Sequence, residues 1–323
     1  MPNYHGVTIG RGVAVLTPTG IGLSGQPLIS DGAGGSSFTF LNSSGFADYS
    51  ITNIKLDASA IDHSTQNFRI SLQSGVSVPT SDQSAKTNVY LTPHVGNKIA
   101  LYDGTRWVMR SGSEKTLAVG TKTADKNYDV FAAYFNDDLQ VEFSAAWTSD
   151  SARSDTLALQ DGILVKNSDH TRRYIGTIRT VSTTEIDDTA TKRFCWNLNN
   201  KVKRLLNRED TTSHSYGTGT FRRFNDGDAT KVEFIVGQSQ ELADLRAVIG
   251  RASGTNFRTA VGYDSTSTPS STNGYAENLS DTGKIQIDDY VLPSVGYHFA
   301  HVLEYATSGG SFNFGRIQIA MSM

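Results

Sequence analysis

Hydrophobic and polar residues alternate with a period of two over much of the chain. The alternation is clearest in the runs Ser50–Ala60, Phe68–Val76, Asn97–Ser111 and Asn127–Trp147, and an Asp-Gly pair interrupts the third run. A period of two places successive side chains on opposite faces of a β-strand, and Asp-Gly between alternating runs is a strong hairpin signal. The chain is therefore predicted to be all-β, with a β-rich middle domain over residues 56–188.

Strand-like runs return between residues 211 and 323, for example in KVEFIVG, NFRTAVGYDS and FNFGRIQIAMSM. A Ser/Thr-rich loop, DSTSTPSSTNGYAEN, interrupts them over Asp264–Asn278 and is polar enough to lie at the surface. Many short strands in a segment of this length are typical of a jelly-roll-like β-sandwich, which we predict for residues 211–323.

Residues 189–210 depart from the alternation. Their apolar positions Phe194, Leu198, Val202 and Leu205 follow one another at spacings of three and four, which is the period of a helix. We predict a short helical neck here. An isolated helix of this length is marginal in water, so it needs a partner. Two partners fit: the copies of the same neck in a homotrimer, or the chain's own β-domain.

The first 55 residues are rich in glycine and poor in apolar residues, including the run DGAGGSS at Asp31–Ser37. Such a segment cannot bury a core of its own. It is either a flexible leader or an arm ordered by docking on another chain. We favour an extended attachment arm over residues 1–55 that contacts other proteins of a larger assembly.

Composition excludes several classes of function. The 29 basic and 32 acidic residues are nearly balanced, which gives no footprint for nucleic acid. No run of apolar residues is long enough for a membrane-spanning helix, and the N-terminus lacks the pattern of a signal peptide. A single cysteine, Cys195, permits neither an intrachain disulfide nor a cysteine-based metal site. We predict no cofactor, no bound metal and no membrane insertion.

Catalytic motifs are also missing from the sequence. There is no nucleophile elbow and no phosphate-binding lysine loop. Adjacent carboxylates occur at Asp137-Asp138, Asp187-Asp188 and Asp288-Asp289, but glycosidases place two carboxyl groups across a cleft, and the first two pairs sit where turns and helix starts favour aspartate. We predict no catalytic residues and a protein that is not an enzyme.

Aromatic residues are better candidates for binding, because flat rings can stack on sugar rings. Tyr263 and Tyr275 flank the polar loop and are expected to be exposed, and Asn273 and Arg222 can donate hydrogen bonds beside them. These four residues form the predicted carbohydrate-binding set. The competing interpretation is that most aromatic side chains pack in the core or in cross-strand pairs.

Three stretches of the middle region, GNKIALYDGTRWVMR (Gly96–Arg110), Phe143–Thr180 and KRFCWN (Lys192–Asn197), resemble a segment that recurs in virion structural proteins of environmental tailed bacteriophages. The resemblance transfers no catalytic residue. It implies a virion location, with synthesis in the host cytoplasm and release by lysis. It also implies a homotrimeric tail fibre or receptor-binding protein that recognises carbohydrate on the host surface. The alternatives are a head fibre or capsid decoration protein and, third, a polysaccharide depolymerase.

Overall fold

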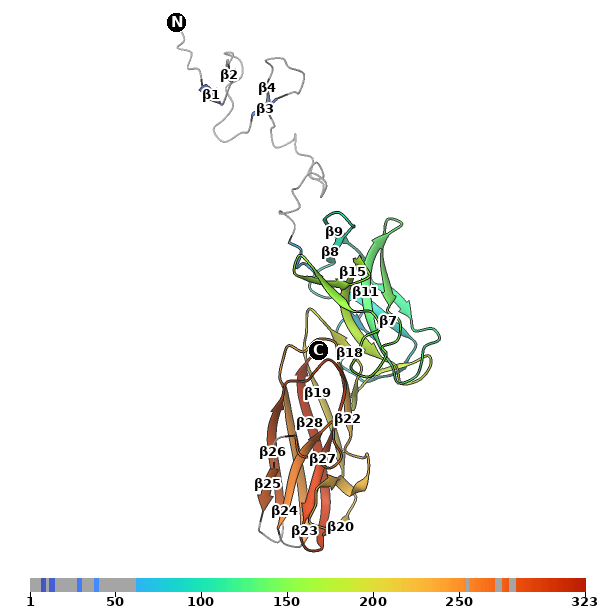
Figure 1. The fold of residues 1–323 in the computed structure, drawn as a ribbon, viewed down its shortest axis with the longest axis vertical. Coiled ribbons are helices and arrows are strands. Elements are labelled where there is room, and N and C mark those ends of the chain that lie inside the picture. The colour runs from blue at the N-terminus through green and yellow to red at the C-terminus, as the bar shows by residue number, and fades with distance from the viewer. Residues whose placement is uncertain are drawn as a thin grey trace. The chain divides into compact units, whose positions relative to one another are not determined.

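A computed structural model of the protein describes residues 62–253, 256–270, 275–278 and 283–323, and the backbone of four short strands nearer the N-terminus (Figure 1). The chain divides into two units, Met1–Ala60 and Ile61–Met323. In the first unit, two antiparallel pairs are formed by β1 (Val7–Ile9) with β2 (Gly12–Ala14) and by β3 (Leu28–Ser30) with β4 (Phe38–Phe40). The other residues of the predicted arm lie outside the described residues, so its attachment role stays a prediction.

The middle part of the second unit contains a three-stranded sheet, a hairpin and a six-stranded sheet. The first is ordered β10 (Lys115–Ala118), β7 (Asn88–Pro93), β5 (Phe68–Ser71), and the hairpin joins β8 (Lys98–Tyr102) to β9 (Trp107–Ser111). The six-stranded sheet is formed by β11 (Asn127–Phe135), β12 (Asp138–Phe143), β13 (Leu157–Gln160), β14 (Ile163–Lys166), β15 (Asp169–Arg179) and β18 (Cys195–Asn197).

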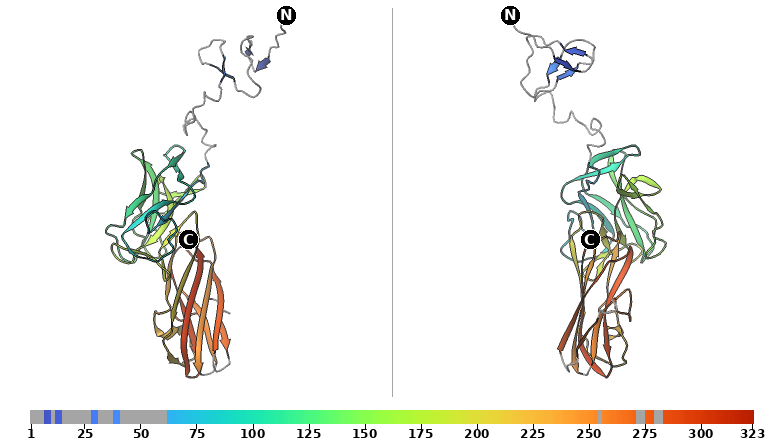
Figure 2. Two further views of the ribbon diagram at one scale, coloured as in Figure 1. Left: turned by 180° about the vertical axis from the view of Figure 1, so that it is seen from behind. Right: turned by 60° about the vertical axis from the view of Figure 1, so that its left-hand side comes forward.

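Two larger sheets form the C-terminal sandwich, and they lie face to face in both views of Figure 2. The eight-stranded sheet contains β6 (Gln83–Lys86), β16 (Ile186–Asp188), β17 (Lys192–Arg193), β21 (Arg222–Arg223), β22 (Val232–Val236), β24 (Phe257–Tyr263), β25 (Tyr275–Asn278) and β27 (Gly296–Ala306). The five-stranded sheet contains β19 (Lys203–Asp210), β20 (His214–Tyr216), β23 (Ala243–Ser253), β26 (Gly283–Val291) and β28 (Gly310–Ser322).

Alternation along the strands builds the hydrophobic cores. On β23, Leu245, Ala247 and Ile249 are buried between the two sheets of the sandwich, where they meet Phe234 and Val302 of the opposite sheet. A second core fills the middle part. Burying one such side chain stabilises the fold by about 1.5–3 kcal/mol. Within the described residues the one helical element is a 3-10 turn, Phe224–Asp226, so the all-β prediction is confirmed.

The predicted helical neck is wrong. Residues 189–210 form the strands β17, β18 and β19, and the chain turns between the last two at Asn199-Asn200, where Asn200 has a φ of 53°. That backbone conformation interrupts a helix and suits asparagine.

The apolar residues assigned to the neck therefore have separate environments. Phe194 is buried in the core of the middle part, Leu198 packs at the edge of the sandwich core and the backbone of Val202 pairs with Met323. Leu205 is half exposed on the outer face of β19. The helical spacing came from residues that belong to different strands and turns. The predicted homotrimer loses this helical interface and stays a prediction.

The boundary predicted between the middle domain and the sandwich also differs from the structure. The strands β6 and β16, which precede residue 189, join the eight-stranded sheet, and β17 connects them to β22 through a parallel pairing. The strand β19, assigned to the neck, pairs along its whole length with β28. The two halves are therefore joined by shared sheets.

Candidate functional site

The outer face of the five-stranded sheet presents an ordered set of polar and apolar side chains. Across the sheet, Leu205 of β19 lies opposite Ala320 of β28, which lies opposite Asp244 of β23, which lies opposite Tyr290 of β26. Directly opposed residues point to the same face of a sheet, so the four side chains form one row. Because the neighbours Leu206 and Leu245 are buried in the core, this row faces outward.

A second row follows two residues along each strand. It consists of Asn207, Gln318, Arg246 and Asp288, again in register across β19, β28, β23 and β26. Arg246 and Asp288 form an ion pair with an Nε–Oδ1 distance of 2.6 Å, and each side chain is about half exposed. The hydrogen bonds from Arg246 and Gln286 lower the pKa of Asp288, because they stabilise its ionised form.

The two rows surround a hollow of about 470 Å³, which we call the sheet groove. Its size lies within the range of pockets that hold small ligands. Tyr290 is the most exposed aromatic side chain on its wall, at 65% of its full accessible surface. The sheet groove is lined by Leu205, Asp244, Leu245, Arg246, Asp288, Asp289, Tyr290, Gln318 and Ala320.

These side chains can bind a hydroxylated ring. A tyrosine ring offers a flat apolar surface, whereas arginine donates several hydrogen bonds, aspartate accepts them, and glutamine does both. Leucine and alanine supply apolar contacts beside them. Such a combination suits a ligand with one apolar face and a rim of hydroxyl groups, which is the character of a pyranose.

Tyr263, one of the predicted binding residues, faces the core. It ends β24, and its ring stacks on His298 with centroids 5.2 Å apart and planes inclined by 24°. Its hydroxyl is buried without a hydrogen-bond partner in the described part of the chain, and burial raises its pKa. Phe234 of β22 contacts the same ring across β27, which lies between the two strands in the sheet. Tyr263 is thus part of the sandwich interior.

Tyr275 lies on the opposite face of the same sheet. It pairs with Ala260, three residues before Tyr263 on β24, and an odd separation reverses the face. Its ring is occupied by the guanidinium of Arg258, whose central carbon lies 4.7 Å from the ring centroid, and it contacts Phe221. Tyr263 and Tyr275 therefore cannot contribute to one binding surface.

Arg222 is also engaged within the chain. Its Nε donates to Oε1 of the fully buried Glu304 at 2.8 Å, and its guanidinium carbon lies 3.9 Å above the ring of Tyr216. Asn273 lies outside the described residues. Arg222 lies opposite Glu304, on the inner face of the eight-stranded sheet, whereas Tyr275 lies on its outer face, so the structure does not assemble the predicted set.

The sequence did carry a signal for the sheet groove. In GKIQIDDYV, strict alternation places Lys284, Gln286, Asp288 and Tyr290 on one face, and this run has no large apolar residue at those positions. In the sequence, Asp288 stands out only as half of a carboxylate pair. The positions of Arg246, Gln318 and Leu205 depend on pairing between distant strands, which the alternation alone does not fix.

The adjacent carboxylates have structural partners instead of facing each other across a cleft. Asp138 pairs with Lys115, and Asp187 pairs with Lys192. Asp188 is buried between two arginines. The pair Asp288-Asp289 splits between the two faces of β26, where Asp289 accepts a hydrogen bond from Ser270.

The described residues contain neither a metal centre nor a membrane-spanning helix. Among residues that the structure describes, no cluster of three or more histidine, cysteine or acidic side chains could hold a metal ion. The described part of the chain also contains no helix with the length and apolar character needed to cross a bilayer.

Comparisons with known proteins give no family. No protein-family model matches, and no curated protein matches the sequence. The solved structures that resemble this chain include dimeric latent PorU from Porphyromonas gingivalis, which is 11% identical, with a TM-score of 0.26. The match covers 62% of this chain and 24% of the PorU chain. A β-porphyranase of glycoside hydrolase family 86 from Bacteroides plebeius is 11% identical, with a TM-score of 0.22. The match covers 76% of this chain and 38% of that chain.

A structure of the Gx strain of infectious bursal disease virus also resembles this chain, with 10% identity and a TM-score of 0.26. The match covers 75% of this chain and 72% of that chain. The chain spans about a quarter of the PorU chain. These TM-scores establish neither a shared fold nor a shared function.

Proposed function

We propose that this protein is a virion structural protein of a tailed bacteriophage and that its C-terminal sandwich binds a carbohydrate of the host surface. The observation that carries the binding part is the sheet groove, in which Tyr290 is exposed beside the half-exposed Arg246–Asp288 ion pair. The virion part is supported by the resemblance of the middle region to phage virion proteins. A tail fibre or receptor-binding protein combines both.

Stacking on Tyr290 supplies the apolar part of this recognition. Arg246 and Asp288 hold each other in place, so their remaining donor and acceptor positions are already oriented toward the groove. Gln286 donates to Asp288 at 2.9 Å and fixes the same carboxylate further. Single sites of this kind are weak, and several copies on one virion raise the overall affinity by avidity.

The test is a glycan array with the full-length protein, followed by calorimetric titration of any glycan that binds. Replacing Tyr290 by alanine removes the stacking surface and is expected to weaken binding at least tenfold, or by about 1.4 kcal/mol. Tyr290→Phe keeps the ring and is expected to stay within a few-fold of the wild type.

Phe135→Ala is the matched control, because Phe135 is an exposed aromatic residue at the turn between β11 and β12, away from the groove. Binding that is equal in Tyr290→Ala and Phe135→Ala would overturn the assignment of the groove. Immunogold labelling of virions with antibody to residues 211–323 tests the location. Label at the tail tip agrees with the proposal, whereas label spread over the head indicates a decoration protein.

A further inference from the structure

A second hollow adjoins the sheet groove and differs from it in charge. It measures about 240 Å³ and lies between the loop of residues 78–82 and the strands β17 and β19. Its wall includes Arg193 of β17 and Lys203, Arg204 and Leu205 of β19. Leu205 also lines the sheet groove, so the two hollows meet at this residue.

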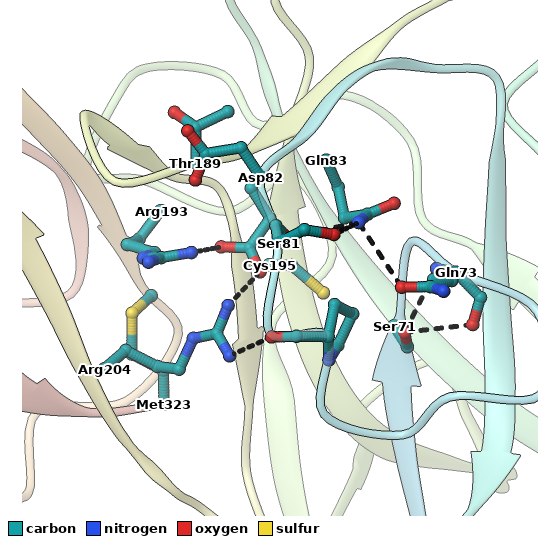
Figure 3. A network of polar contacts seen from close by, with 12 residues as sticks. Ser71, Gln73, Ser81, Asp82, Gln83, Thr189, Arg193, Cys195, Arg204 and Met323 are labelled. Carbon is teal, nitrogen blue, oxygen red and sulfur yellow. Dashed lines mark hydrogen bonds and ion pairs between the residues drawn. The ribbon is translucent and has the colours of Figure 1, made fainter.

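Three arginines gather beneath this second hollow around one buried carboxylate. Asp188 pairs with Arg193 at 3.2 Å and with Arg204 at 3.1 Å, so a single negative charge serves two guanidinium groups. Figure 3 shows these two arginines close to Ser81 and Asp82. Arg69 lies close to the same network, and its hydrogen bonds go to backbone carbonyls, including that of Met323 at 3.1 Å. Burial lowers the pKa of Arg193, and the charge of Arg204 lowers it further.

Acidic residues nearby do not balance this charge. Asp82 stands on the wall of the hollow and accepts a hydrogen bond from the backbone of Ala190 at 2.8 Å. With Asp188 it gives two carboxylates against the three cations of the wall, Arg193, Lys203 and Arg204. Lys203 also pairs with Asp244 at 3.0 Å, but both side chains are at least half exposed, so its ammonium group stays accessible to an anion in the hollow. The second hollow therefore keeps an excess positive charge.

Arg204 also has hydrogen-bonding capacity to spare. It donates from Nη1 to the carbonyl of Pro79 at 2.7 Å and from Nη2 to Asp188, which uses two of the five N–H groups of a guanidinium. The hydroxyl-bearing residues Thr80 and Ser81 line the same hollow and are exposed. Planar donors beside hydroxyl groups suit an oxyanion, which arginine can bind through two parallel hydrogen bonds.

We propose that this second hollow binds an oxyanion, a carboxylate or a phosphate, carried by an acidic unit of the same glycan that occupies the sheet groove. The identity of the carrier rests on the proposed function, whereas the affinity for an oxyanion does not. On the outer face of the sheet groove, Asp244 pairs with Lys203 and Asp288 pairs with Arg246, so the groove offers an acidic group no excess of positive charge. The ligand class is therefore a glycan in which a neutral sugar neighbours an acidic one.

The first test is calorimetric titration of the full-length protein with inorganic phosphate and with sulfate at low ionic strength. Wild-type protein is expected to bind both, and Arg204→Gln and Lys203→Met are expected to weaken binding at least fivefold. Lys284→Met is the matched control, since Lys284 is an exposed lysine on β26 that lines neither hollow. Lys203 is exposed, so Lys203→Met keeps the test decisive even if Arg204→Gln disturbs folding.

The second test compares a glucuronate-containing oligosaccharide with its carboxyl-reduced, neutral counterpart. The acidic form is expected to bind more tightly, and Lys203→Met is expected to remove the difference. Absence of phosphate and sulfate binding, or equal binding in Arg204→Gln, Lys203→Met and wild type, would overturn the oxyanion site. Equal binding of the two glycans would overturn the acidic specificity and leave the proposed function intact. Oxyanion binding without any glycan binding would support the site and refute its carrier.

Discussion

At the scale of single residues, burial decides which polar side chains serve the fold. Glu304 is fully buried and accepts hydrogen bonds from Arg222 at 2.8 Å and from His214 at 2.6 Å. This explains why Arg222 does not serve as a free donor for a ligand. An unpaired buried carboxylate is costly, so the fold retains both partners.

His301 has the opposite environment, and it makes stability depend on pH. It is 1% exposed, its Nδ1 has no hydrogen-bond partner among the described residues, and burial lowers its pKa to about 4. At pH values between the ordinary pKa of 6.5 and this lowered pKa, His301 binds a proton in the unfolded chain but not in the folded chain. The contribution of His301 to stability is therefore fully present above pH 6.5 and is lost as the pH falls, by about 3 kcal/mol when the folded pKa is reached.

We expect His301→Phe to lose less stability than the wild type between pH 6.5 and pH 4.5, measured by urea unfolding at both values. The pKa of His214 is raised, chiefly through Glu304 against the effect of burial, so its contribution is complete below pH 6.5 and does not vary in this window. Equal losses in variant and wild type would show that His301 is not the titrating group.

At the scale of single elements, β19 shows how a strand differs from the helix that its spacing predicts. Its adjacent leucines point to opposite faces: Leu206 is fully buried in the sandwich core, whereas Leu205 is half exposed. In a helix, these two successive residues would be separated by only about 100° around the axis and would not point to opposite faces. The pairing of β19 with β28 fixes the alternation.

Leu206→Ala is expected to destabilise the protein by about 2–5 kcal/mol, because it opens a cavity in the core. Leu205→Ala serves as the control and is expected to change the free energy of unfolding by about 0.5 kcal/mol or less. Denaturant unfolding of both variants measures this difference. Similar losses in the two variants would contradict the position of β19.

The sequence predicted the strands better than it predicted their partners. Alternation and turn signals located strands such as β11, β12 and β24, because both signals depend only on residues that are close together in the sequence. The helix over 189–210 was predicted wrongly because the local spacing of apolar residues outweighed the turn signal at Asn199-Asn200. The sheet groove joins residues of four strands, from Leu205 to Gln318, and local patterns do not fix such long-range pairings.

At the scale of the whole second unit, the eight-stranded sheet takes strands from both halves. Strand β16 pairs with β6, and β17 pairs with β22, so the hydrogen-bonded ladder continues from residues before position 189 to residues after position 230. Arg69 adds a hydrogen bond from β5 to Met323. Unfolding one half alone would leave unpaired strand edges in the other.

We therefore expect residues 62–188 and 211–323 to unfold in one cooperative transition. Hydrogen exchange with mass spectrometry in increasing urea measures this directly, with peptides from β11 reporting on the middle part and peptides from β28 on the sandwich. The two sets should share one midpoint. Separate midpoints, with the sandwich still protected after β11 has exchanged, would contradict this expectation.

The shared sheet also limits how this protein can be recombined. A crossover between residues 189 and 211 would give β17 a foreign partner in place of β22 or of β16, and would give β28 a foreign β19 in some hybrids. Mismatched side chains between those paired strands would destabilise such chimeras. A crossover near Ala60-Ile61 separates the two units without cutting a sheet that the structure describes. Exchange of a binding specificity between related chains should therefore transfer residues 61–323 as one cassette.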